Sequence, residues 1–189
     1  MIAAPLQLAW RLGLLGVIVV LVQIAAVSQI EILGANADLT PLVVASAGLL
    51  AGSLTGAAFG FGIGLFLDLA LVQTVGMSSL LFLTIGYGAG RLRELRDPQG
   101  AAVPVAVGAA ATLVAQLGFS LMQFLLGRDV PLDIEIVWEL VVTVGLGALL
   151  ATPVHALVRR WLLPVLPEDP RRRRRRAYTT GGLSPLSRA

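Results

Sequence analysis

The sequence predicts an all-α membrane protein: a bundle of six transmembrane helices with both chain ends in the cytoplasm. Three observations predict this fold class: the composition, the uncharged runs of membrane-spanning length, and the way the arginines are distributed between those runs. Of 189 residues, 57% are hydrophobic and 13% are charged, and the mean hydropathy is +0.87. A soluble domain of this length could not cover so much apolar surface with polar groups.

The composition also argues against an enzyme. The chain has no cysteine and one histidine, His155, so thiolate chemistry is excluded and most zinc and general-base chemistry is disfavoured. No Gly-rich loop carries the lysine of a phosphate-binding motif, and no pair of carboxylates suggests acid–base catalysis. We therefore expect a non-catalytic protein without a metal or other cofactor.

Three uncharged runs, 12–30, 100–127 and 140–158, each fit one crossing, since a spanning helix needs about 20 apolar residues. A longer stretch, 39–90, carries a single charge, Asp68, and its length fits either two crossings or three. The arginines favour three, because arginine prefers the cytoplasmic side. Six crossings in total place 13 of the 14 arginines inside and leave only Arg128 outside, whereas five crossings would put the arginine-rich tail outside.

The six expected spans cover about 11–29, 39–53, 57–73, 76–92, 101–126 and 138–159. Together they form a transmembrane domain at 1–166, followed by a disordered, arginine-rich tail at 167–189. Breakers mark three of the joins, and a tight turn near 54–57 is expected between the second and third spans; the breakers are Gly34, Asn36, Asp38, Asp97, Pro98, Gly100, Gly127, Asp129 and Pro131. The first span could instead be a cleaved signal peptide, but its apolar run is longer than such peptides usually have.

Glycines recur every fourth residue through the long uncharged stretch. The series comprises Gly48, Gly52, Gly56, Gly60 and Gly64, and Asp68 occupies the next position at the same spacing. Two further glycines, Gly86 and Gly90, repeat that spacing in the fourth span. Small residues at this spacing let helix backbones approach closely in lipid. We expect a packing seam at Gly60, Gly64, Asp68, Gly86 and Gly90, facing either a partner's helix or the protein's own helices.

Asp68 is the only charged residue in this stretch, and the expected third span places it well inside the hydrocarbon. An aspartate there costs on the order of 3 kcal/mol, so it needs a partner or a wet cavity. It could anchor another subunit, serve as a proton or ion site, or form an internal hydrogen bond. Its possible internal partners are Gln23, Gln73, Gln116, Ser120 and Gln123.

The tail carries six consecutive arginines: Arg171, Arg172, Arg173, Arg174, Arg175 and Arg176. A basic run next to a cytoplasmic helix end attracts anionic lipid headgroups by about 1 kcal/mol per residue. No aromatic interleaving or nucleic-acid-binding motif accompanies the run, so we expect contact with anionic lipid and no nucleic-acid partner.

The stretch 38–96 resembles the MreD family of rod shape-determining proteins. The resemblance rests on the Gly-x-x-x-Gly-x-x-x-Asp helix at Gly60, Gly64 and Asp68, the Val75-Gly76 turn, and Gly86-Tyr87 followed by Arg91. It implies a non-enzymatic subunit in the bacterial cytoplasmic membrane. Such a subunit binds the transmembrane helix of MreC and, through it, is linked to MreB, RodA and a class B penicillin-binding protein.

A second class of protein has a similar six-helix architecture, namely the substrate-binding subunits of energy-coupling-factor vitamin transporters. Such a subunit is expected to carry an Ala-x-x-x-Ala docking face on its first helix. The run 12–30 has no such motif, which favours the cell-elongation subunit and leaves the transporter subunit as the alternative.

Overall fold

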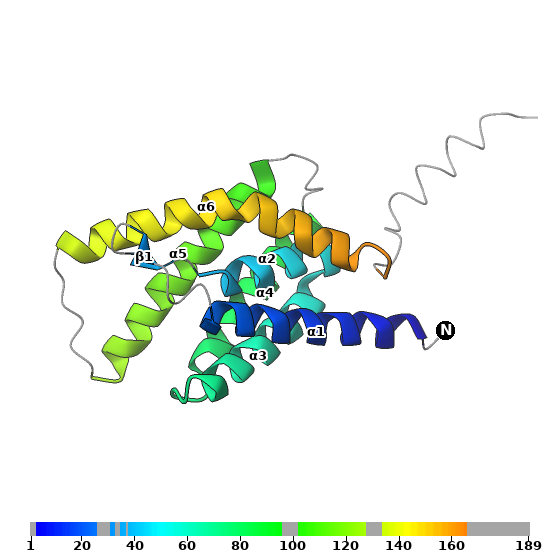
Figure 1. Ribbon diagram of the computed structural model, residues 1–189, viewed down its shortest axis with the longest axis horizontal. Helices are drawn as coiled ribbons and strands as arrows, with labels where there is room; N and C mark the ends of the chain where they lie inside the picture. The colour runs from blue at the N-terminus through cyan, green and yellow to red at the C-terminus, as the bar shows by residue number, and fades with distance from the viewer. Residues whose placement is uncertain are drawn as a thin grey trace, which may run out of the picture.

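The computed structural model describes residues 3–25, 31–32, 35–36, 38–95, 102–127 and 134–165, and in this part the chain is almost entirely helical. Six helices and one very short antiparallel pair of strands follow each other along the chain (Figure 1). In order, they are α1 (Ala3–Ala25), β1 (Glu31–Ile32), β2 (Ala35–Asn36), α2 (Thr40–Ala51), α3 (Ser53–Ala70), α4 (Met77–Leu95), α5 (Ala102–Leu125) and α6 (Ile134–Leu162).

Helix α2 forms the centre of the bundle, where it contacts all five other helices. Every residue from Thr40 to Leu49 is buried, so a helix without a polar face is stable there. Pro41 lies in its first turn, where a missing N–H leaves no bond unmade. The helix ends at Gly52, whose φ of 97° favours glycine, and α3 begins at the next residue. The chain therefore turns at Gly52, earlier than the expected turn near 54–57.

Two helical hairpins and α1 surround this centre. Helices α5 and α6 are antiparallel, since Gly108 lies against Ala151 and Gly147 against Thr112. Phe119 of α5 meets Phe82 of α4 edge to face, with ring centroids 6.2 Å apart, which joins this hairpin to the α3–α4 hairpin.

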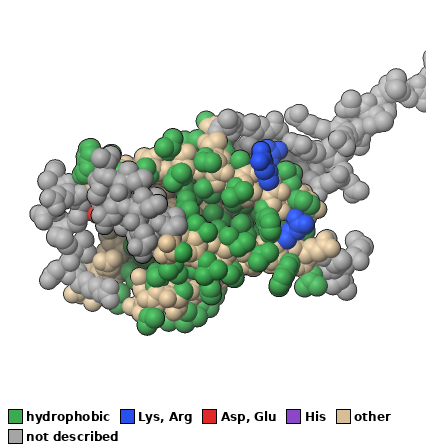
Figure 2. All heavy atoms as spheres, viewed as in Figure 1, with side chains coloured by type: hydrophobic (Ala, Val, Ile, Leu, Met, Phe, Trp, Pro, Cys, Tyr) green, Lys and Arg blue, Asp and Glu red, His purple; other side chains and the backbone are tan. Residues whose placement is uncertain are grey.

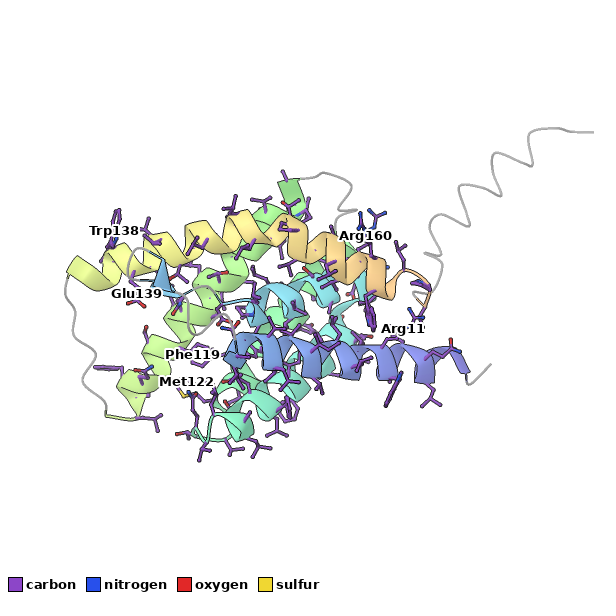
Figure 3. All side chains as sticks on the ribbon, viewed as in Figure 1. Arg11, Phe119, Met122, Trp138, Glu139 and Arg160 are labelled. Carbon is purple, nitrogen blue, oxygen red and sulfur yellow. The ribbon has the colours of Figure 1, made fainter. Side chains whose placement is uncertain are left out.

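The arginines of the described helices gather at one end of the molecule. Arg11 of α1 donates from Nη1 to the carbonyl oxygen of Trp161 at 2.8 Å, and Trp161 Nε1 donates back to the Arg11 carbonyl oxygen at 3.2 Å. Arg11 and Arg160 lie near each other at this end, whereas Trp138 and Glu139 lie at the opposite end of α6 (Figure 3). The basic side chains seen in Figure 2 lie at the same end, and apolar side chains are spread over the rest of the described surface on the face that it shows.

Four helices are long and apolar enough to cross a membrane: Leu6–Ala25, Ser53–Ala70, Ala102–Leu125 and Val137–Leu162. The molecule is therefore a multi-pass α-helical membrane protein. Helix α2 is too short to meet this criterion, since it has only 12 residues. Helix α4 is too highly charged to meet it, since its last turns carry Arg91, Arg93 and Glu94. The six helices follow the order of the six expected spans, although α1 begins at Ala3 rather than near residue 11.

Several residues that the sequence singled out lie outside the described residues. They are the loop residues Gly34, Asp97, Pro98, Gly100, Asp129 and Pro131, together with Arg128 and the tail with Arg171, Arg172, Arg173, Arg174, Arg175 and Arg176.

Candidate functional site

The glycine series forms the contact between α3 and α4, with the end of α2 beside it. A Cβ atom on Gly56 would lie 2.5 Å from the carbonyl oxygen of Gly86 and 2.6 Å from the Cα of Gly48. A Cβ on Gly48 would meet the same carbonyl oxygen at 2.5 Å. These separations are far below van der Waals contact, so the three backbones can meet here only because all three residues are glycine.

The same contact extends in both directions along the hairpin. A Cβ on Gly60 would overlap the carbonyl group of Phe82, and one on Gly64 would lie 2.5 Å from the backbone of Ser78 and Ser79. A Cβ on Gly90 would overlap the backbone of Ser53. The α3–α4 seam is therefore continuous along the hairpin.

This arrangement favours the second of the two alternatives for the seam, in which it packs the protein's own helices. Its expected members are all buried between the chain's own helices: Gly60, Gly64, Asp68, Gly86 and Gly90. The seam glycines contact residues of the protein's own helices. No partner helix can reach the α3–α4 seam unless the hairpin opens.

Asp68 lies at the end of α3 that is near the turn into α4. It is fully buried and comes two residues before the end of the helix, closer to the helix end than the expected span 57–73 placed it. Its carboxylate accepts hydrogen bonds from the backbone N–H of Gly76 at 2.8 Å and of Ser78 at 3.2 Å. The first N–H groups of a helix have no partner within it, so Asp68 caps α4 from the neighbouring helix.

Backbone groups thus replace the side-chain amides expected as partners of Asp68. Gln23 Oε1 instead accepts from the backbone N–H of Leu39 at 3.0 Å. Gln73 does contact Asp68, but through its backbone N–H and the Asp68 carbonyl oxygen at 2.9 Å. The carboxylate's hydrogen bonds in the described part of the chain do not involve the three α5 candidates: Gln116, Ser120 and Gln123.

The turn from α3 to α4 is built to bring Gly76 back to Asp68. Gly76 has a φ of 100°, and Val72 has a φ of 53°. Positive φ is accessible to glycine at no steric cost, whereas a β-branched residue such as valine adopts it rarely. The turn therefore stores some backbone strain at Val72, and the two hydrogen bonds to the buried carboxylate hold it in place.

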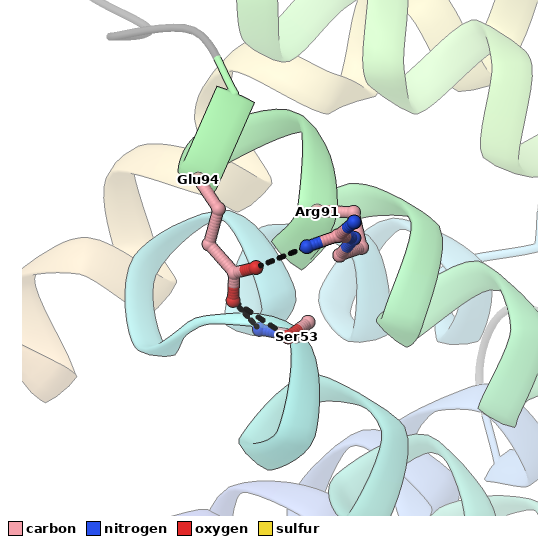
Figure 4. A network of polar contacts seen from close by, with 3 residues as sticks. All are labelled: Ser53, Arg91 and Glu94. Atoms are coloured by element: carbon pink, nitrogen blue, oxygen red, sulfur yellow. Dashed lines mark hydrogen bonds and ion pairs between the residues drawn. The ribbon is translucent and has the colours of Figure 1, made fainter.

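A second carboxylate caps the opposite end of the hairpin (Figure 4). Glu94 Oε1 accepts from the backbone N–H of Ser53 at 3.1 Å and from its hydroxyl at 2.6 Å, and Glu94 Oε2 pairs with Arg91 at 3.2 Å. The Ser53 hydrogen bonds, and secondarily Arg91, lower the pKa of Glu94 below its usual value. Each helix of the hairpin thus provides the carboxylate that caps the other. The sequence had indicated a special role for Asp68 but not for Glu94.

A groove of 680 Å³ lies on the surface between α1 and α3. The two helices approach closely at Gly16, where a Cβ atom would lie 3.0 Å from Ile63 and 3.5 Å from Phe59. Gly13 and Gly62 also line the groove, and a Cβ atom on either of them would have nothing within 4 Å. The groove is apolar except for Thr55 and is lined by Leu8, Ala9, Leu12, Gly13, Gly16, Val17, Leu54, Thr55, Ala58, Phe59, Gly62, Ile63 and Phe66.

Comparisons with protein-family models, with curated proteins and with solved structures find no match to this chain. Within the described residues, no group of three or more His, Cys, Asp or Glu side chains is arranged to hold a metal ion. The candidate sites are therefore defined by their geometry alone. One is the α3–α4 hairpin with its two capping carboxylates, and the other is the α1–α3 groove.

Proposed function

We propose that this protein is a non-catalytic subunit of the bacterial cell-elongation complex in the cytoplasmic membrane, of the kind that the MreD family represents. It would bind the transmembrane helix of MreC and so help to hold MreB, RodA and a class B penicillin-binding protein in register. Its contribution would be a rigid membrane scaffold for peptidoglycan synthesis rather than a chemical step.

The observation that carries this proposal is the shared location of the residues behind the family resemblance. Gly60, Gly64 and Asp68 of α3 meet the Gly76 turn and Gly86 of α4 in one hairpin. A spacing that arose by chance would have no reason to bring its members together. These five residues of the motif therefore share one physical role, which supports a likeness in fold between this chain and that family.

We further propose that all six helices cross the membrane and that both chain ends face the cytoplasm. Helix α2 is enclosed by the other helices, so its 12 residues do not need to match the lipid thickness on their own. The start of α1 lies beside the end of α6 through Arg11 and Trp161, and the start of α3 lies beside the end of α4 through Ser53 and Glu94. The ends of α1, α4 and α6 that meet here carry arginines, which favours the cytoplasmic side.

The internal position of the α3–α4 seam changes where MreC would bind. The partner's helix would pack on an outward apolar face of the bundle, and α5 and α6 offer such faces. Exposed residues on α5 include Leu117, Leu121 and Phe124, and α6 exposes Val141, Leu149 and Leu157. Apolar exposure of this extent is ordinary in lipid, so the contact would depend on shape rather than on hydrophobicity.

Depletion of the protein from its rod-shaped host tests the proposal. We expect the cells to become round, and we expect tagged protein extracted in mild detergent to recover MreC. Depleted cells that keep their rod shape would refute the role in elongation. Recovery of a pair of ATPases together with a tightly bound vitamin would instead identify the transporter subunit.

A further inference from the structure

The α1–α3 groove has the length of one leaflet of a bilayer. Its α1 wall runs from Leu8 to Val17, about 14 Å at 1.5 Å per residue, and its α3 wall runs from Leu54 to Phe66, about 18 Å. The hydrocarbon core of a bilayer is about 30 Å thick, so each leaflet provides about 15 Å. A partner's transmembrane helix would cross both leaflets, whereas a lipid acyl chain fills only one. The dimensions of the groove favour the acyl chain.

The groove also lies in a defined half of the molecule. Leu8 and Leu54, the first groove residues on the two walls, lie at the arginine-rich end, and the lining continues along both helices to Val17 and Phe66. A chain entering from that end would point its methyl terminus toward the bilayer centre, as the acyl chains of lipids do.

A guanidinium group lies near the arginine-rich end of this groove. A Cβ on Gly52 would lie 3.9 Å from Arg93 Nη1, so Arg93 stands beside the chain two residues before Leu54, where the α3 wall begins. In the described part of the chain, Arg93 has no hydrogen bond and no ion pair, whereas Arg91 pairs with Glu94. On the opposite wall, Arg11 precedes the groove residue Leu12, and it adds a second positive charge at this end.

We propose that the α1–α3 groove is a binding site for one anionic phospholipid of the leaflet at the arginine-rich end. One acyl chain fills the space beside Gly13 and Gly62, and Arg93 attracts the headgroup phosphate. The open glycines provide room for the chain, and the apolar walls match its chemistry. Arg93 provides the preference for negative charge, worth about 1 kcal/mol near a membrane surface. The site is separate from the arginine-rich tail, and it does not depend on the proposed role in elongation.

The test uses the full-length protein purified in detergent and titrated with phosphatidylglycerol or phosphatidylcholine carrying the same acyl chains, with bound lipid counted by native mass spectrometry. Gly62→Phe should place a ring in the groove without a backbone clash, since nothing lies within 4 Å of its Cβ position. Gly88→Phe is the matched control, because Gly88 is exposed on α4 and is equally open. The tail is the same in all variants, so its own lipid contacts cancel.

We expect Gly62→Phe to lose one tightly held lipid of either type and Gly88→Phe to keep it. Arg93→Gln should retain that lipid but lose about fivefold in its preference for phosphatidylglycerol, while Arg160→Gln should leave the preference unchanged. Gly13→Phe tests the opposite wall and replaces Gly62→Phe if that variant fails to fold. Groove variants that bind lipid as the wild type does would overturn the proposal. Equal losses in the groove variants and in Gly88→Phe would overturn it too.

Discussion

The two ends of the α3–α4 hairpin use the same chemistry in opposite environments. At one end, the fully buried Asp68 carboxylate accepts two backbone N–H groups at the start of α4. At the other end, Glu94 accepts the N–H and hydroxyl groups of Ser53 at the start of α3, but its side chain is 41% exposed. Both carboxylates satisfy donors that a helix leaves without partners.

The two ends differ in whether water can replace the carboxylate as the hydrogen-bond acceptor. Water can reach the start of α3 and bond to Ser53 if Glu94 is removed. Water cannot replace Asp68 at the N–H of Ser78 without opening the turn between α3 and α4, because both residues are buried. A buried donor without a partner costs the full desolvation of that group, so the same kind of cap contributes far more to stability at the Asp68 end than at the Glu94 end.

Removing the buried cap should produce the largest effect. Asp68→Leu leaves the buried N–H of Ser78 and the partly buried N–H of Gly76 without their acceptor, and a buried donor without a partner costs about 2 kcal/mol. We expect a loss of up to about 4 kcal/mol in the free energy of unfolding, measured in detergent or lipid discs. Asp68→Asn keeps one acceptor and should lose less. Equal stability of Asp68→Leu and the wild type would mean that the cap is not structural.

A third capping carboxylate, Asp38, should give a smaller effect with a distinct pH dependence. Its Oδ1 accepts from the backbone N–H of Thr40 at 3.0 Å, and burial raises the pKa of Asp38 from 3.8 to about 6, although the Thr40 hydrogen bond opposes the rise. The folded state then holds the proton more tightly than the unfolded state does. The free energy of unfolding should therefore fall as the pH rises from about 4 to about 6, by at most about 3 kcal/mol.

Asp38→Asn provides the control for that pH dependence. The variant cannot ionise, so its free energy of unfolding should change less than that of the wild type between pH 4 and pH 6. A pH profile unchanged by the substitution would assign the slope to other groups.

The exposed cap should give the smallest effect, with the opposite sign. Because the pKa of Glu94 is lowered in the folded state, its contribution is complete above pH 4.5 and is lost as the pH falls through the lowered value. Glu94→Gln should therefore change the stability only slightly at neutral pH, and high salt should reduce even that difference. A loss as large as that of Asp68→Leu would show that exposure does not separate the two ends.

The fold class was accessible from the sequence because hydropathy and arginine placement report directly on the membrane. The four-residue spacing of Gly60, Gly64, Gly86 and Gly90 correctly indicated close backbone contact. It could not identify the partner, since small residues permit approach by any helix, from the same chain or from another. The six crossings and the side on which the chain ends lie remain predictions.

The role of Asp68 was less accessible for a physical reason. Side-chain amides such as Gln116 can be found by reading a sequence, but the free N–H groups at the start of a helix belong to every residue type. A signal did exist, because Gly76 at a turn eight residues after Asp68 is the type of residue that adopts positive φ. The α1–α3 groove left no such signal, since a groove results from two helices separating, and residues such as Gly13 and Gly62 do not reveal that separation.

The glycine motif packs the chain's own α3–α4 hairpin. Four Gly→Ala substitutions test it most directly: Gly60 and Gly86 in the seam, and Gly62 and Gly88 two residues further along on the exposed side. In one set of unfolding measurements, the seam variants should lose about 2 kcal/mol or more through overpacking. The exposed variants should gain up to about 1 kcal/mol, because alanine favours a helix over glycine. Seam variants as stable as the exposed ones, with MreC binding lost, would contradict the account and return the seam to a partner's helix.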